Sequence, residues 1–284
     1  MSKRVRCAPP SLLRCLPVLL ALAAPAGAQT TPPGSDSMAE IAKDLANPVA
    51  NLISVPFQNN WDYHLGTTDA TLYTLNVQPV IPIGLNERYI LVTRTIVPYV
   101  SYNALVPGTS GAGGLGDTQA SIFLTTREAA KGGWFLGVGP VLQIPTATSR
   151  STGSGKWGAG PTGIVLRQHR GWTYGLLASQ TWSFAGPESR ASVNTTFLEP
   201  FLTYTTKTYT TLGVFTESAY DWTGDKWTVP VEAMASQVLM VGKQVFSVTV
   251  GGRYWAESPA GGPDWGLRLA LTLIFEENKE KAGP

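Results

Sequence analysis

The sequence has little cysteine, and both cysteines lie near its beginning. They are Cys7 and Cys15 in a chain of 284 residues. Both precede Ala28, where a basic head, a short apolar run and the Ala26-Gly27-Ala28 site predict a cleaved secretory signal peptide, residues 1–28. We therefore expect an exported mature chain without cysteine, which excludes disulfides, thiol chemistry and cysteine-based metal sites.

Excess positive charge is also missing once the signal peptide is removed. The sequence has 21 lysines and arginines against 19 aspartates and glutamates. Four of the basic residues lie before Ala28, so the mature chain has 17 basic and 19 acidic residues. A nearly balanced chain offers no broad basic surface, and nucleic acid is not an expected partner.

Long apolar runs are absent after the signal peptide. No stretch reaches the roughly 18–20 apolar residues that a membrane-spanning helix needs. An exported chain of this kind is either a soluble β protein or a barrel in the outer membrane, because only helices and closed barrels satisfy the backbone inside a bilayer.

Nucleotide-binding motifs are absent too. Gly-Ser-Gly-Lys at 153–156 resembles part of a phosphate-binding loop, but Arg150 stands at its first glycine position. Trp157 follows Lys156 where the motif requires serine or threonine to hold Mg²⁺. We therefore interpret this stretch as a polar loop that leads into a β-strand.

Catalytic and metal-binding patterns are equally sparse. The chain has two histidines, His64 and His169, and candidate serines such as Ser101 are distant in sequence. No cluster of histidine and carboxylate residues has the spacing of a metal site. We expect no enzyme activity, no catalytic residue, no metal and no cofactor. Strand pairing can bring a distant serine close to a histidine, so a lipid-modifying enzyme stays open as an alternative.

What the sequence has in abundance is a two-faced pattern of alternating residues, from Ser54 onward. In Trp265–Phe275 the odd positions are all leucine, tryptophan or phenylalanine, whereas the even positions include glycine, arginine and threonine. Such alternation predicts strands with one face against apolar surroundings. We predict about twelve strands, at 54–64, 69–83, 88–102, 116–128, 133–146, 157–168, 172–184, 195–205, 209–221, 226–240, 244–255 and 265–275.

The connections between these segments alternate between short and long. Short ones include Gly84–Glu87 and His169–Gly171, and long ones include Asn103–Leu115 and Ala147–Lys156. Short periplasmic turns, longer outer loops and an even strand count are typical of outer-membrane barrels. A strand of about eleven residues tilted by about 40° spans roughly 28 Å, the height of the apolar band. The predicted fold is all-β, a transmembrane antiparallel β-barrel over residues 54–275.

Aromatic residues near the strand ends fit the interfacial girdles of such a barrel. We expect this placement for Trp134, Trp157, Trp172, Trp182, Trp222, Trp227, Trp255 and Trp265.

The segment before the barrel, residues 29–53, contains one predicted helix. Ser37 and Glu40 have the spacing of a capping box, and Ile41 and Leu45 form an apolar stripe. We predict a short helix over Met38–Ala46, which lies at the periplasmic mouth, enters the lumen as a plug or tethers the barrel. A charged tail, residues 276–284, follows the last strand.

Charged residues fall on the strand face opposite the apolar one, which in a barrel is the lumen. Ionised groups on the lipid face cost about 2–4 kcal/mol near the midplane, so inward placement is favoured. These charges form either a polar pathway or an ion-pair network that closes a narrow barrel. The lumen-lining candidates are Asp62, Arg94, Asp117, Arg127, Gln143, Glu199, Glu217, Glu232, Arg253 and Arg268, with Asn60, Gln78 and Gln119 beside them.

Several separated blocks of the chain together resemble a known family. They include NPVANLISVPFQNN, SGKWGAGPTGIVLRQ, WTYGLLASQTWSFAG and GGPDWGLRLALTLIF. They look like the bacterial outer-membrane proteins associated with the meta-pathway of phenol degradation, which are labelled as transporters and sometimes, misleadingly, as neuromedin U. The resemblance covers about Asn47–Phe275 and implies a barrel, an outer-membrane location and passage of small apolar or aromatic compounds.

The function expected from these observations is a monomeric outer-membrane barrel that admits small compounds passively. Its expected partners are outer-membrane lipid, an unidentified small solute and, during insertion, the barrel-assembly machinery. One alternative is a closed structural barrel, or one that contacts partners through outer loops such as Ala104–Gly114 and Ser149–Lys156. The other alternative is the lipid-modifying enzyme that uses His64 or His169.

Overall fold

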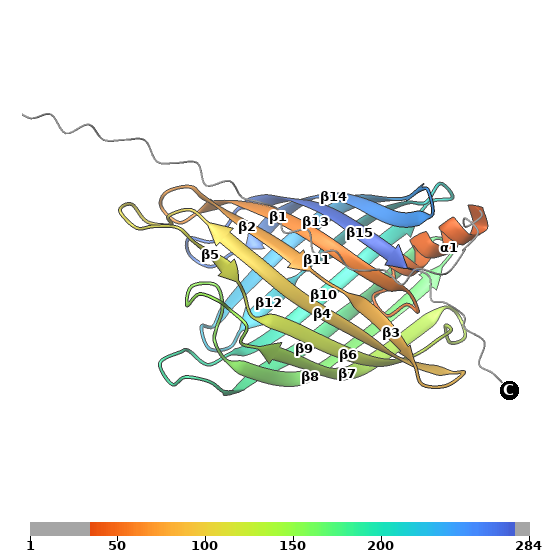
Figure 1. Ribbon diagram of the computed structural model, residues 1–284, viewed down its shortest axis with the longest axis horizontal. Coiled ribbons are helices and arrows are strands. Elements are labelled where there is room, and N and C mark those ends of the chain that lie inside the picture. Colours follow the sequence, from red (N-terminus) through yellow and green to blue (C-terminus); the bar gives the residue numbers. More distant parts are fainter. Residues whose placement is uncertain (1–34, 276–284) are drawn as a thin grey trace, which may run out of the picture. The chain divides into compact units, whose positions relative to one another are not determined.

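The protein forms one closed antiparallel β-barrel in a computed structural model that describes residues 35–275 (Figure 1). The expected signal peptide and charged tail lie outside these residues. The sheet closes because the strand at one end of its order, β9, also pairs with β10. The strands are β1 (Ile53–Leu65), β2 (Ala70–Val77), β3 (Val80–Gly84), β4 (Tyr89–Tyr102), β5 (Ala112–Leu115), β6 (Thr118–Thr126), β7 (Trp134–Ile144), β8 (Trp157–His169), β9 (Trp172–Ala185), β10 (Asn194–Thr205), β11 (Thr210–Thr216), β12 (Ser218–Asp221), β13 (Lys226–Val241), β14 (Gln244–Glu257) and β15 (Trp265–Phe275).

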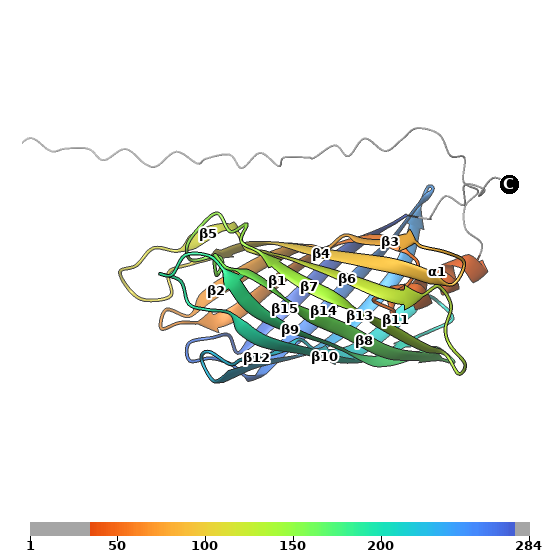
Figure 2. The ribbon, with the colours of Figure 1, turned by 90° about the horizontal axis from the view of Figure 1, so that it is seen from below.

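The fifteen strands make twelve barrel-spanning segments, which we call walls. Nine walls are single strands, and three walls each consist of two strands separated by one interruption. β2 and β3 share the neighbours β1 and β4, β5 and β6 both pair with β4, and β11 and β12 both lie between β10 and β13. The predicted twelve-stranded barrel is therefore confirmed. The walls run obliquely to the barrel axis, with the short turns at one end and the long loops at the other (Figures 1 and 2).

Proline explains where two of the walls are interrupted. Pro79 separates β2 from β3 and has no N–H to donate to the neighbouring strand. β11 ends at Thr216, which the register places across from Pro200 in β10, where a second backbone donor is missing. At each gap the register continues unchanged on the far side, so the wall is interrupted without slipping.

Glycine lets neighbouring walls approach closely at two further points. A Cβ atom on Gly139 of β7 would lie 1.8 Å from the carbonyl oxygen of Ile122, and one on Gly160 of β8 would lie 1.8 Å from that of Gln180. Any side chain at these positions would push the strands apart. We infer that both glycines serve the bending of the closed sheet.

The two faces of the barrel wall differ as the alternation predicts. Along β15 exposed and buried residues alternate almost without interruption. The exposed side chains are apolar: Leu267 and Leu269 are 46% and 44% exposed, whereas Arg268 between them is 6% exposed. The outer surface therefore carries the apolar band and the inner surface carries the charge.

Seven of the eight tryptophans expected in the girdles are exposed by 41–58%. Trp255 is the exception, since it is only 8% exposed, and the guanidinium of Arg253 lies 4.7 Å from its ring. The expectation was wrong for this residue. Trp255 has the same parity along β14 as Arg253, whereas Tyr254 between them is 64% exposed, so the alternation places this ring on the inner face although it lies near a strand end.

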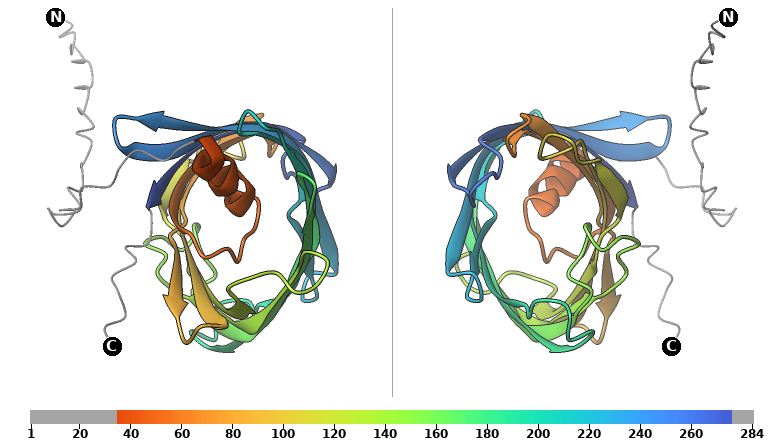
Figure 3. Two further views of the ribbon diagram at one scale, coloured as in Figure 1. Left: turned by 90° about the vertical axis from the view of Figure 1, so that its right-hand side faces the viewer. Right: turned by 90° about the vertical axis from the view of Figure 1, so that its left-hand side faces the viewer.

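The N-terminal helix α1 (Ser35–Leu45) lies within the outline of the barrel at the short-turn end (Figure 3). It begins before Ser37, so the predicted capping box does not form its start. No helix among the described residues is long and apolar enough to cross a membrane.

Two apolar clusters hold this N-terminal segment against the inner wall. Met38, Ile41 and Ala42 of α1 pack with Val238, Val245 and Ile274. Val49, which is fully buried, joins a second cluster with Ile90, Val92, Phe123, Ile164, Leu166 and Leu177. Across the mouth, Nε2 of Gln168 donates a hydrogen bond to the backbone oxygen of Lys43 at 2.8 Å. The helix therefore lies inside the barrel at its short-turn end, and it does not tether the barrel from outside.

Candidate functional site

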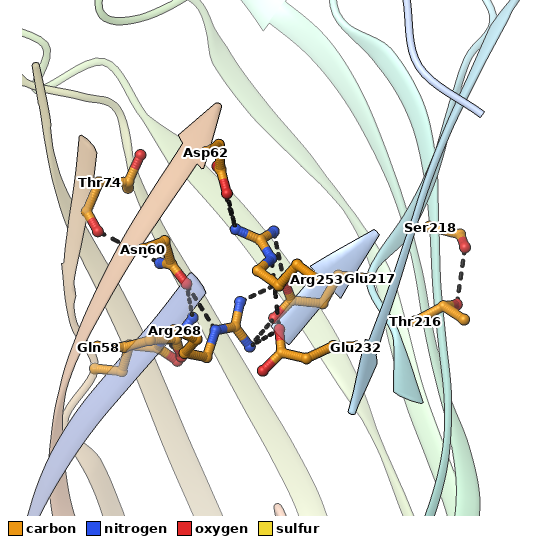
Figure 4. Close-up of polar contacts among 11 residues, drawn as sticks. Gln58, Asn60, Asp62, Thr74, Thr216, Glu217, Ser218, Glu232, Arg253 and Arg268 are labelled. Carbon is orange, nitrogen blue, oxygen red and sulfur yellow. Dashed lines mark hydrogen bonds and ion pairs between the residues drawn. The ribbon is translucent and has the colours of Figure 1, made fainter. Parts of the chain in front are cut away.

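The lumen contains a network of five charged side chains (Figure 4), which we call the paired network. It consists of Asp62, Glu217, Glu232, Arg253 and Arg268, which come from β1, the gap between β11 and β12, β13, β14 and β15. All five are candidates that alternation placed in the lumen, and the closed sheet brings them together from walls that are distant in the sequence.

Each arginine of the paired network contacts more than one carboxylate. Arg253 Nη1 lies 2.9 Å from Asp62 Oδ1, and its other nitrogens lie 3.5 Å from Glu217 Oε2 and 3.4 Å from Glu232 Oε2. Arg268 Nη2 and Nη1 lie 2.9 Å from Glu217 Oε2 and from Glu232 Oε2. Glu217 and Glu232 are therefore each shared between the two guanidinium groups.

A neutral residue completes the surroundings of Arg268. Nε of Arg268 donates to Oδ1 of Asn60 at 2.7 Å, and Nδ2 of Asn60 donates to the backbone oxygen of Thr74 at 3.4 Å. The side chains of Arg268, Asp62 and Glu232 are at most 6% exposed. Within residues 35–275, both carboxylate oxygens of Glu232 and Nε of Arg253 are buried without a hydrogen bond, so ion pairs alone hold them. Such a buried and ion-paired arrangement has the character of a structural element.

Beside this network lie two cavities inside the barrel. The first, of about 220 Å³, lies between the N-terminal segment and the wall, and Asp44, Leu52 and Ser247 are among its lining residues. The second, of about 290 Å³, is lined by side chains such as Asn76, Phe123 and Glu217. Gln78, Arg94 and Glu199 line both cavities, so they mark the boundary between them.

Arg94 and Glu199 reach this boundary from nearly opposite sides of the barrel. β4, which carries Arg94, lies five places from β10, which carries Glu199, in the ring of twelve walls. Within residues 35–275 the two side chains form no ion pair with each other. Arg94 Nη2 donates to the neutral amide oxygen of Gln78 at 3.0 Å. We call Arg94 and Glu199 the cross-lumen pair.

Three other candidates lie away from both cavities. Asp117 accepts hydrogen bonds at 2.7 Å from the backbone N–H and the hydroxyl of Ser154, so it anchors the loop after Ile144. Gln143 donates to the hydroxyl of the same serine at 2.6 Å. Arg127 donates through Nε to the backbone oxygen of Asn86 in a short turn at 3.0 Å. These three side chains stabilise loops at the two ends of the barrel.

The loop that Asp117 anchors contains the Gly-Ser-Gly-Lys stretch. Nζ of Lys156 donates to the backbone oxygen of Pro187 at 2.7 Å, and Nε of Arg190 donates to that of Ser154 at 2.7 Å. β8 begins at Trp157, directly after the lysine. The stretch is therefore the end of an outer loop, tied to the next outer loop, as the interpretation of the sequence requires.

The polar contacts of His64 are with carboxylates. Nδ1 of His64 lies 3.2 Å from Oδ2 of Asp264, and Nε2 lies 3.7 Å from Oδ1 of Asp69. In the part of the chain that the structure describes, neither His64 nor His169 is hydrogen-bonded to a serine hydroxyl. Over the same residues no group of three or more histidine, cysteine or acidic side chains is placed to hold a metal ion.

One carboxyl at the barrel mouth has an altered affinity for protons. Burial raises the pKa of Asp44, near the end of α1, from 3.8 to about 6. Its charged neighbours on the helix act in opposite directions, since Lys43 lowers this pKa and Glu40 raises it. The group lines the first cavity and changes its charge within a mildly acidic range.

The apolar side chains of the second cavity were not predicted from the sequence. Ile96, Phe123, Leu177 and Phe197 line it from four different strands. In the sequence, an inward apolar residue that lines a cavity looks the same as an inward apolar residue that packs against another side chain. Alternation shows which face of the strand a residue occupies, but not what it contacts there. Only the closed sheet shows that these four surround one space.

Comparisons with known proteins show the fold. No family model and no curated protein match the sequence. An outer membrane channel from Pseudomonas putida F1 is 14% identical and superposes with a TM-score of 0.62 over 80% of this chain and 96% of its own. Outer membrane phospholipase A from Escherichia coli is 10% identical, with a TM-score of 0.44 over 84% of this chain and 98% of its own. The beta domain of a Bordetella autotransporter is 12% identical, with a TM-score of 0.44 over 79% and 100%. The likeness to the channel establishes a barrel of the outer-membrane type.

Proposed function

We propose that this protein is an outer-membrane channel through which small solutes pass passively. The observation that carries this proposal is the pair of cavities inside the barrel, whose shared boundary is formed by Gln78, Arg94 and Glu199. A barrel that served only as a scaffold would gain stability from filling this space with packed side chains. The solved channel from Pseudomonas putida F1, which has the same fold, supports the proposal.

The outer surface supports residence in the outer membrane. Large apolar side chains such as Leu136, Val138 and Leu212 are 52–63% exposed on the barrel wall. In water such a continuous apolar band would promote aggregation, whereas lipid solvates it. We therefore propose an exported monomer whose partners are outer-membrane lipid and, during insertion, the barrel-assembly machinery.

We further propose that the chain belongs to the family associated with the meta-pathway of phenol degradation. The sequence blocks quoted above support this membership, and they extend from the N-terminal segment to the last strand. The family association suggests apolar or aromatic compounds as solutes. Phe123 and Phe197 in the second cavity provide surfaces on which such compounds can lie.

The proposal is tested by solute entry into liposomes that contain the folded full-length mature chain. Ser121 lines the second cavity, so Ser121→Trp is expected to fill it and lower the swelling rate several-fold. Leu136→Trp adds the same ring on the outer wall, where Leu136 is 63% exposed, and is the matched control. Equal swelling rates for both variants and the parent chain would contradict passage through the lumen.

A closed structural barrel is the second candidate, and one observation favours it. The paired network occupies one side of the lumen, and α1 with Val49 occupies the short-turn end. Under this reading the cavities are isolated, and liposomes containing folded protein would swell no faster than empty ones. The swelling experiment therefore separates the two candidates directly.

A further inference from the structure

The cross-lumen pair differs from every other arginine and glutamate of the inner wall. The carboxylate of Glu199 makes no hydrogen bond or ion pair within residues 35–275, and Arg94 is bonded only to Gln78 there. The charged groups that act on Glu199 are Arg94, Glu217 and Arg268. Two opposite charges thus face a common space without closing it.

A second carboxylate lies beside Glu199. The register of β10 with β11 and β12 places Glu199 directly across from Glu217, at the gap between the two short strands. Residues directly across from each other in an antiparallel sheet share a face, so both carboxylates point into the lumen. Both line the second cavity. Like charges across a strand pair are destabilising unless a positive group lies between or beside them.

Within residues 35–275, only one of the two carboxylates forms an ion pair with an arginine. Glu217 contacts both arginines of the paired network. Glu199 contacts neither. A positively charged group of a solute in the second cavity would therefore find one carboxylate that is not already paired, next to another that is.

The complementary charge comes from the other side of the lumen, at the same boundary between the two cavities. The guanidinium group of Arg94 has five N–H donors. One of its nitrogens, Nη2, donates to Gln78. Ile96, Phe123, Leu177 and Phe197 line the same cavity. The volume of about 290 Å³ corresponds to roughly ten water molecules at about 30 Å³ each, which is enough for a solute of the size of leucine.

We propose that the second cavity binds a small zwitterion with an apolar side chain, of the α-amino acid type. Its carboxylate binds Arg94, its ammonium group binds Glu199 beside Glu217, and its apolar group lies against the phenylalanines. This proposal rests on the proposed function, because it names the solute class that the channel selects.

Single charges fit the cavity less well. A solute with only a carboxylate would place its charge near Glu199 and Glu217 without compensation, and a solute with only an ammonium group would leave Arg94 without a partner. Sites that are built to bind a charged group discriminate strongly against analogues that lack it, because their own polar groups then stay unpaired. The arrangement therefore selects for both charges in one molecule.

The test measures equilibrium binding to the folded full-length mature chain by isothermal titration calorimetry. The probes are leucine, isocaproate, which lacks the ammonium group, and isoamylamine, which lacks the carboxylate. Leucine is expected to bind at least about tenfold more tightly than either analogue, which corresponds to about 1.4 kcal/mol. Equal affinity for all three, or no binding of leucine up to its solubility limit, would overturn the proposal.

Variants assign each charge to its residue. Arg94→Gln is expected to lower the affinity for leucine about tenfold and to leave the affinity for isoamylamine unchanged or higher. Glu199→Gln is expected to lower the affinity for leucine about tenfold and to leave the affinity for isocaproate unchanged or higher. Arg88→Gln, in an exposed short turn, is the matched control and should bind leucine like the parent chain. The double variant Arg94→Glu with Glu199→Arg restores one charge of each sign and should recover leucine binding. Leucine would then bind in the opposite orientation, with its ammonium group at position 94 and its carboxylate at position 199. If neither single variant changes leucine affinity while both are folded, the proposal is wrong.

Binding and passage give separable results. If liposomes swell but leucine does not bind, the solute class is wrong and the channel stands. If leucine binds with the expected preference but no solute enters liposomes, the site is supported and the channel is wrong. Faster entry of leucine than of isocaproate, lost in Glu199→Gln, would support both.

Discussion

The paired network and the cross-lumen pair are built from the same residue types in the same lumen, yet they are satisfied to different degrees. In the paired network each arginine contacts two or more carboxylates at 2.9–3.5 Å. In the cross-lumen pair, arginine and glutamate face each other without an ion pair in the described residues. Ion pairs hold the side chains of the paired network to one another, whereas the carboxylate of Glu199, which forms no ion pair in the described residues, leaves an acceptor for a solute.

The difference arises from the order of the walls around the barrel. The members of the paired network lie on walls that are neighbours or nearly so, from β11 and β12 through β13, β14 and β15 to β1. Their side chains meet without crossing the lumen. Arg94 and Glu199 lie on walls that are nearly opposite, so they meet only by spanning the interior.

The largest expected effect separates the two regions by stability. Arg268→Ala removes a buried partner from Glu217 and Glu232, and breaking a buried ion pair costs about 3–5 kcal/mol. Arg94→Ala removes one hydrogen bond to a neutral amide and is expected to cost about 1 kcal/mol. The measurement is urea unfolding in lipid vesicles, followed by tryptophan fluorescence. Equal destabilisation by the two substitutions would remove the distinction between the regions.

The next effect concerns ion selectivity. Glu199→Gln removes a charge that no ion pair in the described residues neutralises, so the reversal potential in a salt gradient should shift toward anions. Asp62→Asn removes a charge that Arg253 already pairs at 2.9 Å, and its shift should be less than half as large. A larger shift for Asp62→Asn than for Glu199→Gln would show that the paired network, and not the cross-lumen pair, controls the pathway.

A third effect concerns the N-terminal segment that closes the short-turn end beside both regions. Ala42 is 1% exposed in its cluster, so Ala42→Glu buries a charge and should displace α1 from the barrel mouth. We expect single-channel conductance to rise about twofold or more, with the barrel folded. Glu40→Ala, on the exposed side of the same helix, is the control. Unchanged conductance in Ala42→Glu would show that the segment does not limit the pathway.

The smallest expected effect is a dependence on pH through Asp44. Its pKa of about 6 in the folded protein exceeds the ordinary value of 3.8, so its contribution to helix packing is complete below about pH 4. That contribution decreases as the pH rises and is lost above about pH 6. Conductance should therefore increase modestly between about pH 4 and pH 7.

Asp44→Asn tests the assignment, because Arg94 and Glu199 also line the first cavity. The variant should flatten the pH dependence, whereas Glu40→Gln should change it little. A pH dependence that persists in Asp44→Asn would assign it to another group.

The fold could be predicted from the sequence because lipid solvates one face of every strand. Each inward arginine or glutamate alternates with an outward leucine or valine, as Arg268 does between Leu267 and Leu269, so the period of two is nearly uninterrupted. The interruption of a wall at Pro79 and at Glu217 was not predicted, because it changes the hydrogen bonding without changing the alternation. Trp255 was assigned to the outer girdle because it lies near a strand end, although the alternation of β14 places it on the inner face with Arg253.

The candidate site could be predicted only as a set of inward residues. Alternation places Arg94 and Arg268 on the same face, but their different roles depend on which walls become neighbours when the sheet closes. The same reason explains why Asp117, Gln143 and Arg127 were grouped with the lumen although they hold loops at the barrel ends. The position of α1 could not be predicted either, since its apolar stripe is satisfied by any apolar surface.

The most direct test of the channel is single-channel conductance of the folded full-length mature chain in a planar bilayer. We expect discrete conductance steps that become smaller in Ser121→Trp and larger in Ala42→Glu. A folded barrel that shows no conductance steps in the parent chain or in Ala42→Glu would contradict a water-filled pathway and favour the closed structural barrel.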